Sequence, residues 1–563
     1  MTSLGEHKEI YDEFKEIRDI QFNYHKEKHS LENVQELAIN MKYFKDDDII
    51  IGKEFCPEID EMTLKDFIEK INERKFNLMI LSHDYPRYDQ TEQWFGTEYA
   101  KIEPDLDHEK PLLMFQNDFC KSFFKPDTKF RLPHGFVYIH FRCNLTESSI
   151  SNLNMTSIYS ICIKNFLTET FYPATVAGYS YKLNSVDDGL ILKLNGFSEK
   201  LPQLVEAIMN AIRSTNESID ISVFEAFAKE LKKNCYNFLI NSNFLSEELR
   251  LNIIKPNHMF YFNRFKDADK ISYSKFKEFL AMLFKCVNVR ILIQGNFSKC
   301  QALQITEKIL SHFNDEKISY KIPEDANACQ IPTEASYLRV KSFLPHDQNS
   351  VIKNYYQVGG STMESDCLLE LLVKIMKEPL FNYIRTEQQL GYSVICLSKK
   401  DKNVIGMTIT VETQEKKNSA RIVDEKIESF LKNFNQNLTN IDEKDFEMLK
   451  KSIINHKRIS VDDLETEVNF NWNEIRKNSL MFDRNDIEAR QMELLTKNDL
   501  VTFYYDHFQG NYVRKLSIQV ISNTDDNDSL LHHGFLHLNL ISDENHKTIS
   551  DVMKYKHSLA PCV

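Results

Sequence analysis

The residues whose types and spacing could do chemistry lie in the stretch 378–396, EPLFNYIRTEQQLGYSVIC. Arg385 is expected on a short helix, and Tyr392 on the first residue of the strand that follows. A guanidinium or a phenol O–H aimed at a peptide carbonyl can stabilise a developing oxyanion, and losing such a donor typically lowers the rate by ~10²–10³. A structural explanation stays open, in which Arg385 satisfies last-turn carbonyls and Tyr392 is a half-buried tyrosine.

The elements that must position these two side chains follow from the flanking sequence. A helix is predicted before them by apolar residues at helical spacing, namely Leu368, Leu371, Leu372 and Ile375. Pro379 is expected to interrupt or restart that helix, because proline lacks an N–H and suits a first turn. Residues 380–390 then form a second short helix, Gly391 caps it in the left-handed conformation, and SVICL forms a strand.

Length and composition bound the class of protein. The 563 residues suffice for several domains of roughly 100–200 residues each. The net charge of −13 disfavours a nucleic-acid footprint, and no run approaches the ~18 apolar residues of a membrane span. The 11 cysteines include no C-x-x-C pair, which predicts reduced thiols, and the charged N-terminus is no secretory signal. We therefore expect a cytoplasmic protein that binds neither nucleic acid nor membrane.

Two kinds of sequence unit recur along the chain. A helix followed by a strand is predicted at 63–81, 275–294 and 499–521, with Phe67, Phe279 and Phe503 at matching positions. A second unit starts with GYSYK at 178–182 and with GYSV at 391–394. Each GYS is followed by a charged turn, a strand and an amphipathic helix, whose apolar face must bury against a sheet.

These repeats predict the domain organisation and the fold class. Two full copies of a mixed α and β unit are expected at 131–334 and 335–563, and the end of a third copy at 1–100. Residues 101–130 contain three prolines among acidic and aromatic residues and are expected to be a linker. The fold class is thus α+β, and the chain is expected to begin inside a repeat.

The stretch FNYIRTEQQLGYSV at 381–394 resembles the second-half signature of the pitrilysin family of inverzincin metallopeptidases, which includes insulin-degrading enzyme and nardilysin. The segments at 91–103, 469–484 and 554–561 resemble other parts of the same family, so the resemblance covers nearly the whole chain. It implies α/β roll domains in two halves that close around a peptide chamber. By this resemblance the chain comprises the end of the second domain (1–100), the inter-half hinge (101–130), the third domain and the fourth domain.

Catalysis in that family needs H-x-x-E-H on a helix, where two histidines bind zinc and the glutamate is the base. None of the 17 histidines belongs to such a motif. His25 and His29 have the spacing, but their acid stands one position early; His533 and His537 enclose no carboxylate, and His108 has no partner histidine. We expect no metal and no cofactor in this chain, and zinc only in a domain that would precede Met1.

The resemblance also implies a role for the pair in the opening stretch. R-T-x-x-Q-L-G-Y is intact from Arg385 to Tyr392, and in the family this pair contacts substrate near the scissile bond. In the first copy the corresponding residues are Tyr172 and Tyr179, so only the second copy has the arginine. Arg385 and Tyr392 are therefore expected to be auxiliary contacts to the substrate or the transition state.

The function expected from these observations is that of a C-terminal half of an insulysin-like zinc metalloendopeptidase. The chain would form a wall of the peptide chamber and would be inactive alone. Its partners would be peptide substrates, and a zinc-bearing N-terminal half or a second copy of itself. A non-catalytic peptide-binding scaffold of the same family, or a truncated product, are the alternatives.

Overall fold

The computed structural model describes residues 15, 30–50, 90–91, 98–99, 110–285, 287–313, 327–459, 461, 463–510, 512–523, 531–532, 535–536, 538–542 and 548–562. The chain divides into two compact units, Met1–Pro104 and Asp105–Val563. The described elements of the first unit are α2 (Ser30–Asn40), the 3₁₀ turn η2 (Asp46–Asp48), and the antiparallel pair β1 (Gln90–Thr91) and β2 (Glu98–Tyr99). Most of the roll-domain end expected at 1–100, Phe67 included, lies outside the described residues.

The second unit begins with a mixed six-stranded sheet. In sheet order its strands are β3 (Leu112–Gln116), β4 (Cys120–Pro126), β8 (Val287–Gly295), β5 (His134–Cys143), β7 (Gly189–Phe197) and β6 (Ser180–Val186). β4 and β8 run parallel, and every other neighbouring pair is antiparallel. The linker expected over 101–130 therefore does not hold for residues 112–126, because the apolar run of Cys120, Phe123 and Phe124 is buried in this sheet.

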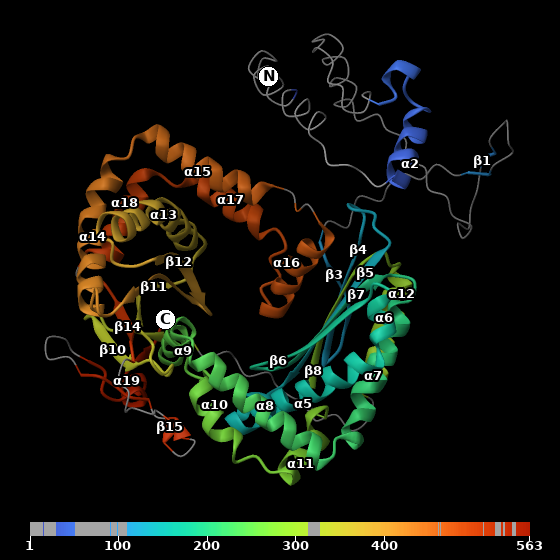
Figure 1. Ribbon diagram of the computed structural model, residues 1–563, viewed down its shortest axis with the longest axis horizontal. Coiled ribbons are helices and arrows are strands. Elements are labelled where there is room, and N and C mark those ends of the chain that lie inside the picture. The colour runs from blue at the N-terminus through green and yellow to red at the C-terminus, as the bar shows by residue number, and fades with distance from the viewer. Residues whose placement is uncertain are drawn as a thin grey trace. The chain divides into compact units, whose positions relative to one another are not determined.

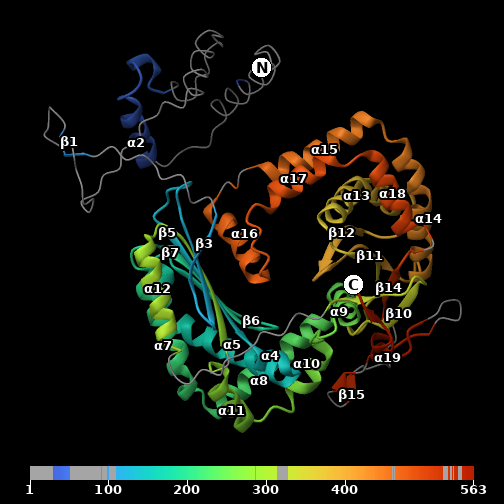
Figure 2. The ribbon, with the colours of Figure 1, turned by 180° about the vertical axis from the view of Figure 1, so that it is seen from behind.

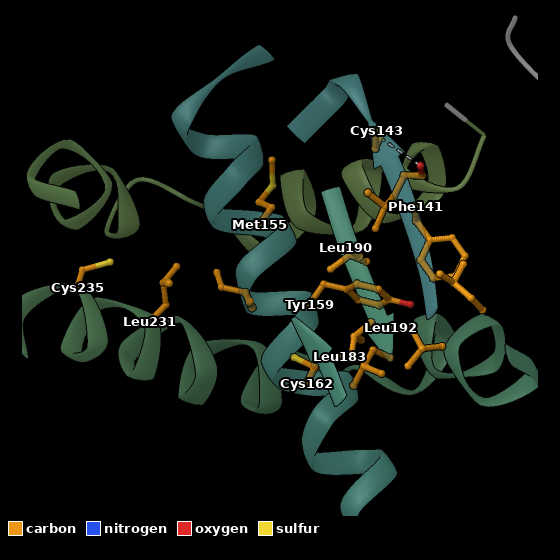
Figure 3. Packing of buried hydrophobic residues seen from close by; sticks show 14 of the residues in the cluster. Phe141, Cys143, Met155, Tyr159, Cys162, Leu183, Leu190, Leu192, Leu231 and Cys235 are labelled. Atoms are coloured by element: carbon orange, nitrogen blue, oxygen red, sulfur yellow. Dashed lines mark hydrogen bonds between the residues drawn. The ribbon is translucent and has the colours of Figure 1, made fainter. Parts of the chain in front are cut away.

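Helices cover one face of the first sheet (Figure 1). The helices α4 (Asn144–Ser148), α5 (Ile150–Thr170), α7 (Leu201–Ser218) and α12 (Lys299–Ser311) contact its strands. Four more helices pack on α5, namely α6 (Tyr172–Val176), α8 (Ile221–Leu239), α10 (Tyr261–Ala268) and α11 (Tyr273–Leu283). Figure 3 shows Tyr159 of α5 beside Leu190 and Leu192 of β7, and Cys162 beside Leu183 of β6. Alternate strand residues point to opposite faces, so Phe136 and Tyr138 lie on the other face of the sheet.

The second sheet repeats this order with five strands. They are β10 (Ser336–Lys341), β14 (Lys515–Ile521), β11 (Asn349–Gly360), β13 (Val404–Gln414) and β12 (Ser393–Asp401). β10 and β14 run parallel and the others antiparallel. One face is covered by α13 (Met363–Phe381), α14 (Ala420–Asn440) and α18 (Lys497–Phe508), and α15 (Glu443–Arg458) and α17 (Arg484–Leu494) pack on α13.

The strand orders confirm the predicted repeat and the α+β class. β4–β8–β5–β7–β6 corresponds to β10–β14–β11–β13–β12, and the buried residues Phe279 and Phe503 lie on corresponding helices, α11 and α18. We call residues 120–295 the first repeat and residues 336–521 the second repeat. The short elements are the pair β9 (Cys329–Gln330) and β17 (Ala560–Pro561), the pair β15 (Leu531–His532) and β16 (Phe535–Leu536), and α19 (Val552–His557).

The two repeats exchange a helix. α9 (Ser242–Ile254) of the first repeat packs on β11 and β14, and α16 (Leu464–Lys477) of the second repeat packs on β5 and β8. Figure 2 shows α16 beside the face of the first sheet that α5 and α7 leave uncovered. Trp472 of α16 meets Tyr138 there edge to face, with ring centroids 5.7 Å apart. Each repeat thus covers the open sheet face of the other.

Candidate functional site

Arg385 is carried by a π-helical turn that continues α13. The helix begins with a reciprocal cap between Thr362 and Ser365 and runs through Pro379 to Phe381, after which residues Asn382–Glu387 are π-helical. Pro379 thus neither interrupts nor restarts the helix, because the buried apolar face of α13 holds it against the second sheet. A proline leaves one carbonyl of the preceding turn without its usual N–H, and π turns are frequent at functional sites.

The turn after this helix is closed by a different residue from the one expected. Gln389, not Gly391, adopts the left-handed conformation, with φ of 53°. Gly391 is needed for close packing instead, because a Cβ built there would lie 2.4 Å from the backbone oxygen of Glu412 and 2.9 Å from Cγ1 of Val411. The glycine therefore lets the start of β12 approach β13.

The side chain of Arg385 is exposed on the π turn. Its guanidinium carbon lies 5.1 Å from the ring centroid of Phe381, one turn earlier. Among the residues that the structure describes, no carboxylate pairs with it and no last-turn carbonyl accepts its hydrogens. The planar fork of N–H donors is therefore available to a carbonyl or carboxylate of another molecule.

Tyr392 directly precedes the edge strand β12, which begins at Ser393 and not at Tyr392 as expected, and it is 56% exposed. Its hydroxyl donates a hydrogen bond to Oε1 of Glu412 on β13. This hydrogen bond, helped by partial burial and the charge of Glu412, raises the pKa of Tyr392 to about 12. The phenol is thus a neutral, outward-facing side chain and not a half-buried one. Because the π turn contacts β12, Arg385 and Tyr392 belong to one corner of the second sheet.

Sequence reasoning missed Glu412 and the helix that holds it. Oε2 of Glu412 accepts a hydrogen bond of 3.2 Å from Nδ2 of Asn243, on α9 of the first repeat. Asn243 and Glu412 are far apart in the sequence, and the exchange of α9 between the repeats brings them together. For this reason their contact could not be predicted from the sequence. The pairing of β12 with β13, which places Glu412 opposite Ser393, was equally invisible before the fold was known.

The same face of α9 carries a charged network across the second sheet. Glu247 accepts hydrogen bonds from Arg250 at 2.8 Å and from Lys353 of β11 at 2.9 Å, and it lies 3.2 Å from Nζ of Lys399 on β12. Arg250 is buried and donates to Asp401, at the end of β12, at 2.6 Å. α9 therefore fastens the edge strand that follows Tyr392.

The edge strand itself exposes apolar side chains. Ile395 is 41% exposed and Leu397 is 44% exposed, while Cys396 between them is buried in the core. An edge strand presents unpaired backbone groups to which an extended chain can add. The corner at residues 385–392 therefore adjoins a strand that can take an extended peptide.

The corresponding corner of the first repeat differs in detail. Tyr172 is exposed at the start of α6, where the second repeat has Arg385 in its π turn. Gly178, with φ of 86°, closes that turn, and the ring of Tyr179 lies against Gly196 of β7. In the first repeat Gly196 thus lies under the ring of Tyr179. In the second repeat the carboxylate of Glu412 instead accepts a hydrogen bond from the hydroxyl of Tyr392.

The described residues contain no group of three or more histidine, cysteine, aspartate or glutamate side chains placed to hold a metal ion. His25, His29, His108, His533 and His537 lie outside the described part of the chain. Since the full sequence also lacks H-x-x-E-H, its residues do not fit the zinc of the family that the sequence resembles. Within the described residues no helix is long and apolar enough to cross a membrane.

Family profiles match this chain over much of its length. The middle or third domain of peptidase M16 matches residues 22–108 and 100–262, and the C-terminal lobe domain 4 of PQQ synthase PqqF-like proteins matches residues 371–472. The repeated α+β domains and these matches define the class: the chain belongs to the M16 pitrilysin family of peptidases.

Within the family the chain is similar to nardilysin and insulin-degrading enzyme. It is 28% identical to nardilysin from Homo sapiens over 564 residues, which cover 92% of this chain and 48% of nardilysin. It is 23% identical to insulin-degrading enzyme from Bos taurus over 570 residues, which cover 93% of this chain and 55% of that enzyme. The chain thus spans about half the length of these curated relatives.

Two solved structures share the fold. The crystal structure of pitrilysin superposes with a TM-score of 0.68 and 16% identity, covering 98% of this chain and 61% of that chain. The peptidase M16 inactive domain from Pseudomonas fluorescens superposes with a TM-score of 0.52 and 12% identity, covering 72% of this chain and 96% of that chain. At these identities the likeness concerns the fold alone.

Proposed function

We propose that this chain acts as the C-terminal half of an insulysin-like zinc metalloendopeptidase. It forms a wall of the peptide-degrading chamber and contacts the substrate through Arg385 and Tyr392, while a separate zinc-bearing half supplies the metal chemistry. The observation that carries the proposal is the exposed guanidinium of Arg385, which no carboxylate of the described chain pairs with, beside the exposed phenol of Tyr392 in an intact family motif. An arginine in this position can bind a peptide carbonyl in the ground state and in the transition state.

The test is complementation. The chain is mixed with the zinc-bearing half of nardilysin, and hydrolysis of an internally quenched peptide is measured. Arg385→Ala should lower kcat/KM by ~10²–10³ if the guanidinium stabilises the oxyanion, and it should also raise KM. Tyr392→Phe should lower kcat/KM without loss of folding. The matched controls are Arg421→Ala and Tyr505→Phe, which alter an exposed arginine and an exposed tyrosine on other helices. Unchanged kinetics in both site variants would refute the proposal.

Metal content is the second prediction, and it rests on the sequence. Because no H-x-x-E-H motif is present among the 563 residues, the purified chain should hold far less than one equivalent of zinc after dialysis. Elemental analysis by plasma mass spectrometry checks this. A stoichiometric zinc that survives dialysis would show that other residues of the chain bind it.

The absence of that motif from the sequence also favours a second candidate, a non-catalytic peptide-binding scaffold of the same family. The two candidates differ in one measurement. A scaffold binds an unstructured peptide but restores no hydrolysis with a zinc-bearing half, whereas an enzyme half does both.

A further inference from the structure

The direction of the hydrogen bond at Tyr392 limits what this side chain can offer a ligand. A phenol has one proton, and an ionised carboxylate has none, so the hydroxyl donates and Glu412 accepts. While this bond is in place, the oxygen of Tyr392 presents only its lone pairs to the surroundings. The phenol is then a hydrogen-bond acceptor toward a ligand, and Arg385 is the donor of the corner.

Glu412 is held in place from two sides. Its second oxygen accepts from Asn243, and its backbone lies against Gly391, which has no side chain to push it away. Asn243, Glu247 and Arg250 follow one another at i, i+4 and i+7, so they share one face of α9. The ion pairs of Glu247 with Lys353 and of Arg250 with Asp401 anchor this face to the second sheet.

We propose that Glu412 is a positioning residue, held by Asn243, that makes Tyr392 a hydrogen-bond acceptor toward bound peptide. This inference rests on the proposed function in taking a peptide as the ligand. An extended peptide backbone carries both N–H and C=O groups, so it can offer an N–H to the oxygen of Tyr392 and a carbonyl to Arg385. Glu412 thereby selects which backbone groups of the peptide face the corner.

The first experiment measures how firmly Tyr392 keeps the proton that it donates to Glu412, and it needs no substrate. A 3-fluorotyrosine is introduced at position 392 alone, and its ionisation is followed by fluorine NMR. The hydrogen bond to Glu412 is the largest of the causes that raise the pKa of Tyr392 to about 12, ahead of partial burial and the charges of Glu412 and Asp347. Glu412→Gln should therefore lower the titration midpoint. Asn243→Ala should lower it by less, because Glu412 then keeps its charge but loses a restraint.

The matched control is Glu387→Gln, which removes one exposed carboxylate from the same corner. If Glu412 acts by its hydrogen bond, Glu387→Gln should move the midpoint much less than Glu412→Gln. Equal shifts in the two variants, or no shift in Glu412→Gln, would overturn the proposal. Circular dichroism of each variant ensures that a shift is not caused by unfolding.

The second experiment tests the acceptor role with a peptide. A fluorescein-labelled unstructured dodecapeptide is compared with analogues in which one backbone N–H at a time is methylated. One position should cost about fivefold in affinity for the wild-type chain, the worth of a typical hydrogen bond, and should cost nothing in Tyr392→Phe. If no methylated position discriminates the two proteins, the acceptor role is refuted. If the unmodified peptide fails to bind, the proposed function fails with it, while the titration still decides whether Glu412 accepts the hydrogen bond of Tyr392.

Discussion

Gly391 shows at the scale of single residues how closely the corner is packed. A Cβ added there would lie 2.4 Å from the backbone oxygen of Glu412, a distance that real Cβ atoms do not show. The atom in the way belongs to the backbone of β13, which is paired with a strand on each side, so it cannot move like the end of a flexible side chain. Glycine is therefore required by the spacing of two strands and not by its own backbone angles.

Gly391→Ala should destabilise the chain by about 1–3 kcal/mol, the usual cost of overpacking. It should also move the titration of Tyr392, since Glu412 and Tyr392 flank the displaced contact. Urea unfolding followed by circular dichroism measures the first effect. Gly510→Ala is the control, because its nearest atom lies 3.2 Å away, and an equal loss of stability in both variants would contradict the explanation.

At the scale of elements, the ion-pair network of α9 fastens this helix to the second sheet. Burial alone would raise the pKa of Glu247, but the hydrogen bond from Arg250 and the charges of Lys353 and Lys399 outweigh it and hold the pKa below the ordinary 4.5. A carboxyl whose pKa is lowered by folding stabilises the fold above its unfolded pKa. That contribution is lost as the pH falls from about 4.5 through the folded pKa.

Glu247→Gln should therefore lower the free energy of unfolding by about 1–3 kcal/mol at pH 7, because a buried arginine and a lysine lose a partner. The difference between wild type and variant should shrink as the pH is lowered below 4.5, because Glu247 of the unfolded wild-type chain then takes up a proton that the folded chain does not yet bind. Urea midpoints at pH 7.0, 4.5 and 3.5 measure this. Glu425→Gln, which breaks the exposed pair with Arg421, should change little, and a wild-type advantage that grows in acid would contradict the sign.

Prediction from the sequence succeeded where the information was local. The amphipathic helices expected after each GYS unit are α7 and α14, and their apolar faces are buried as predicted, for example Ile208 and Ile427. The strands of both units also formed. The errors at Pro379 and Gln389 arose because packing of α13 on a sheet decided the backbone, which no local preference could reveal.

At the scale of the whole molecule, the sequence could not predict on which sheet the helix α16 packs. Leu464, Val468 and Trp472 form an apolar stripe of α16. The stripe predicts burial, but it does not say against which sheet. Nothing in residues 464–477 points to the first repeat, from whose strands they are separated by more than one hundred residues.

Trp472→Ala should remove one of the largest fully buried side chains and cost about 3–5 kcal/mol, as such truncations do in cores. Since α16 covers the first sheet, the variant should also become sensitive to protease between α15 and α16. Limited proteolysis with mass mapping, beside urea unfolding, measures both effects. Trp472→Phe is the control and should lose less, and a variant with unchanged resistance would show that α16 is held by other contacts.

The exchange of α9 and α16 has a consequence for the ancestry of the two repeats. If two repeats packed separately, the sequence of each could change independently, limited only by the packing of its own core. Here Tyr138 contacts Trp472 of the second repeat, and Lys353 pairs with Glu247 of the first repeat. A substitution at Tyr138 or Lys353 is therefore tolerated only if it fits its partner in the other repeat. A change at either contact in one repeat therefore calls for a matching change in the other repeat.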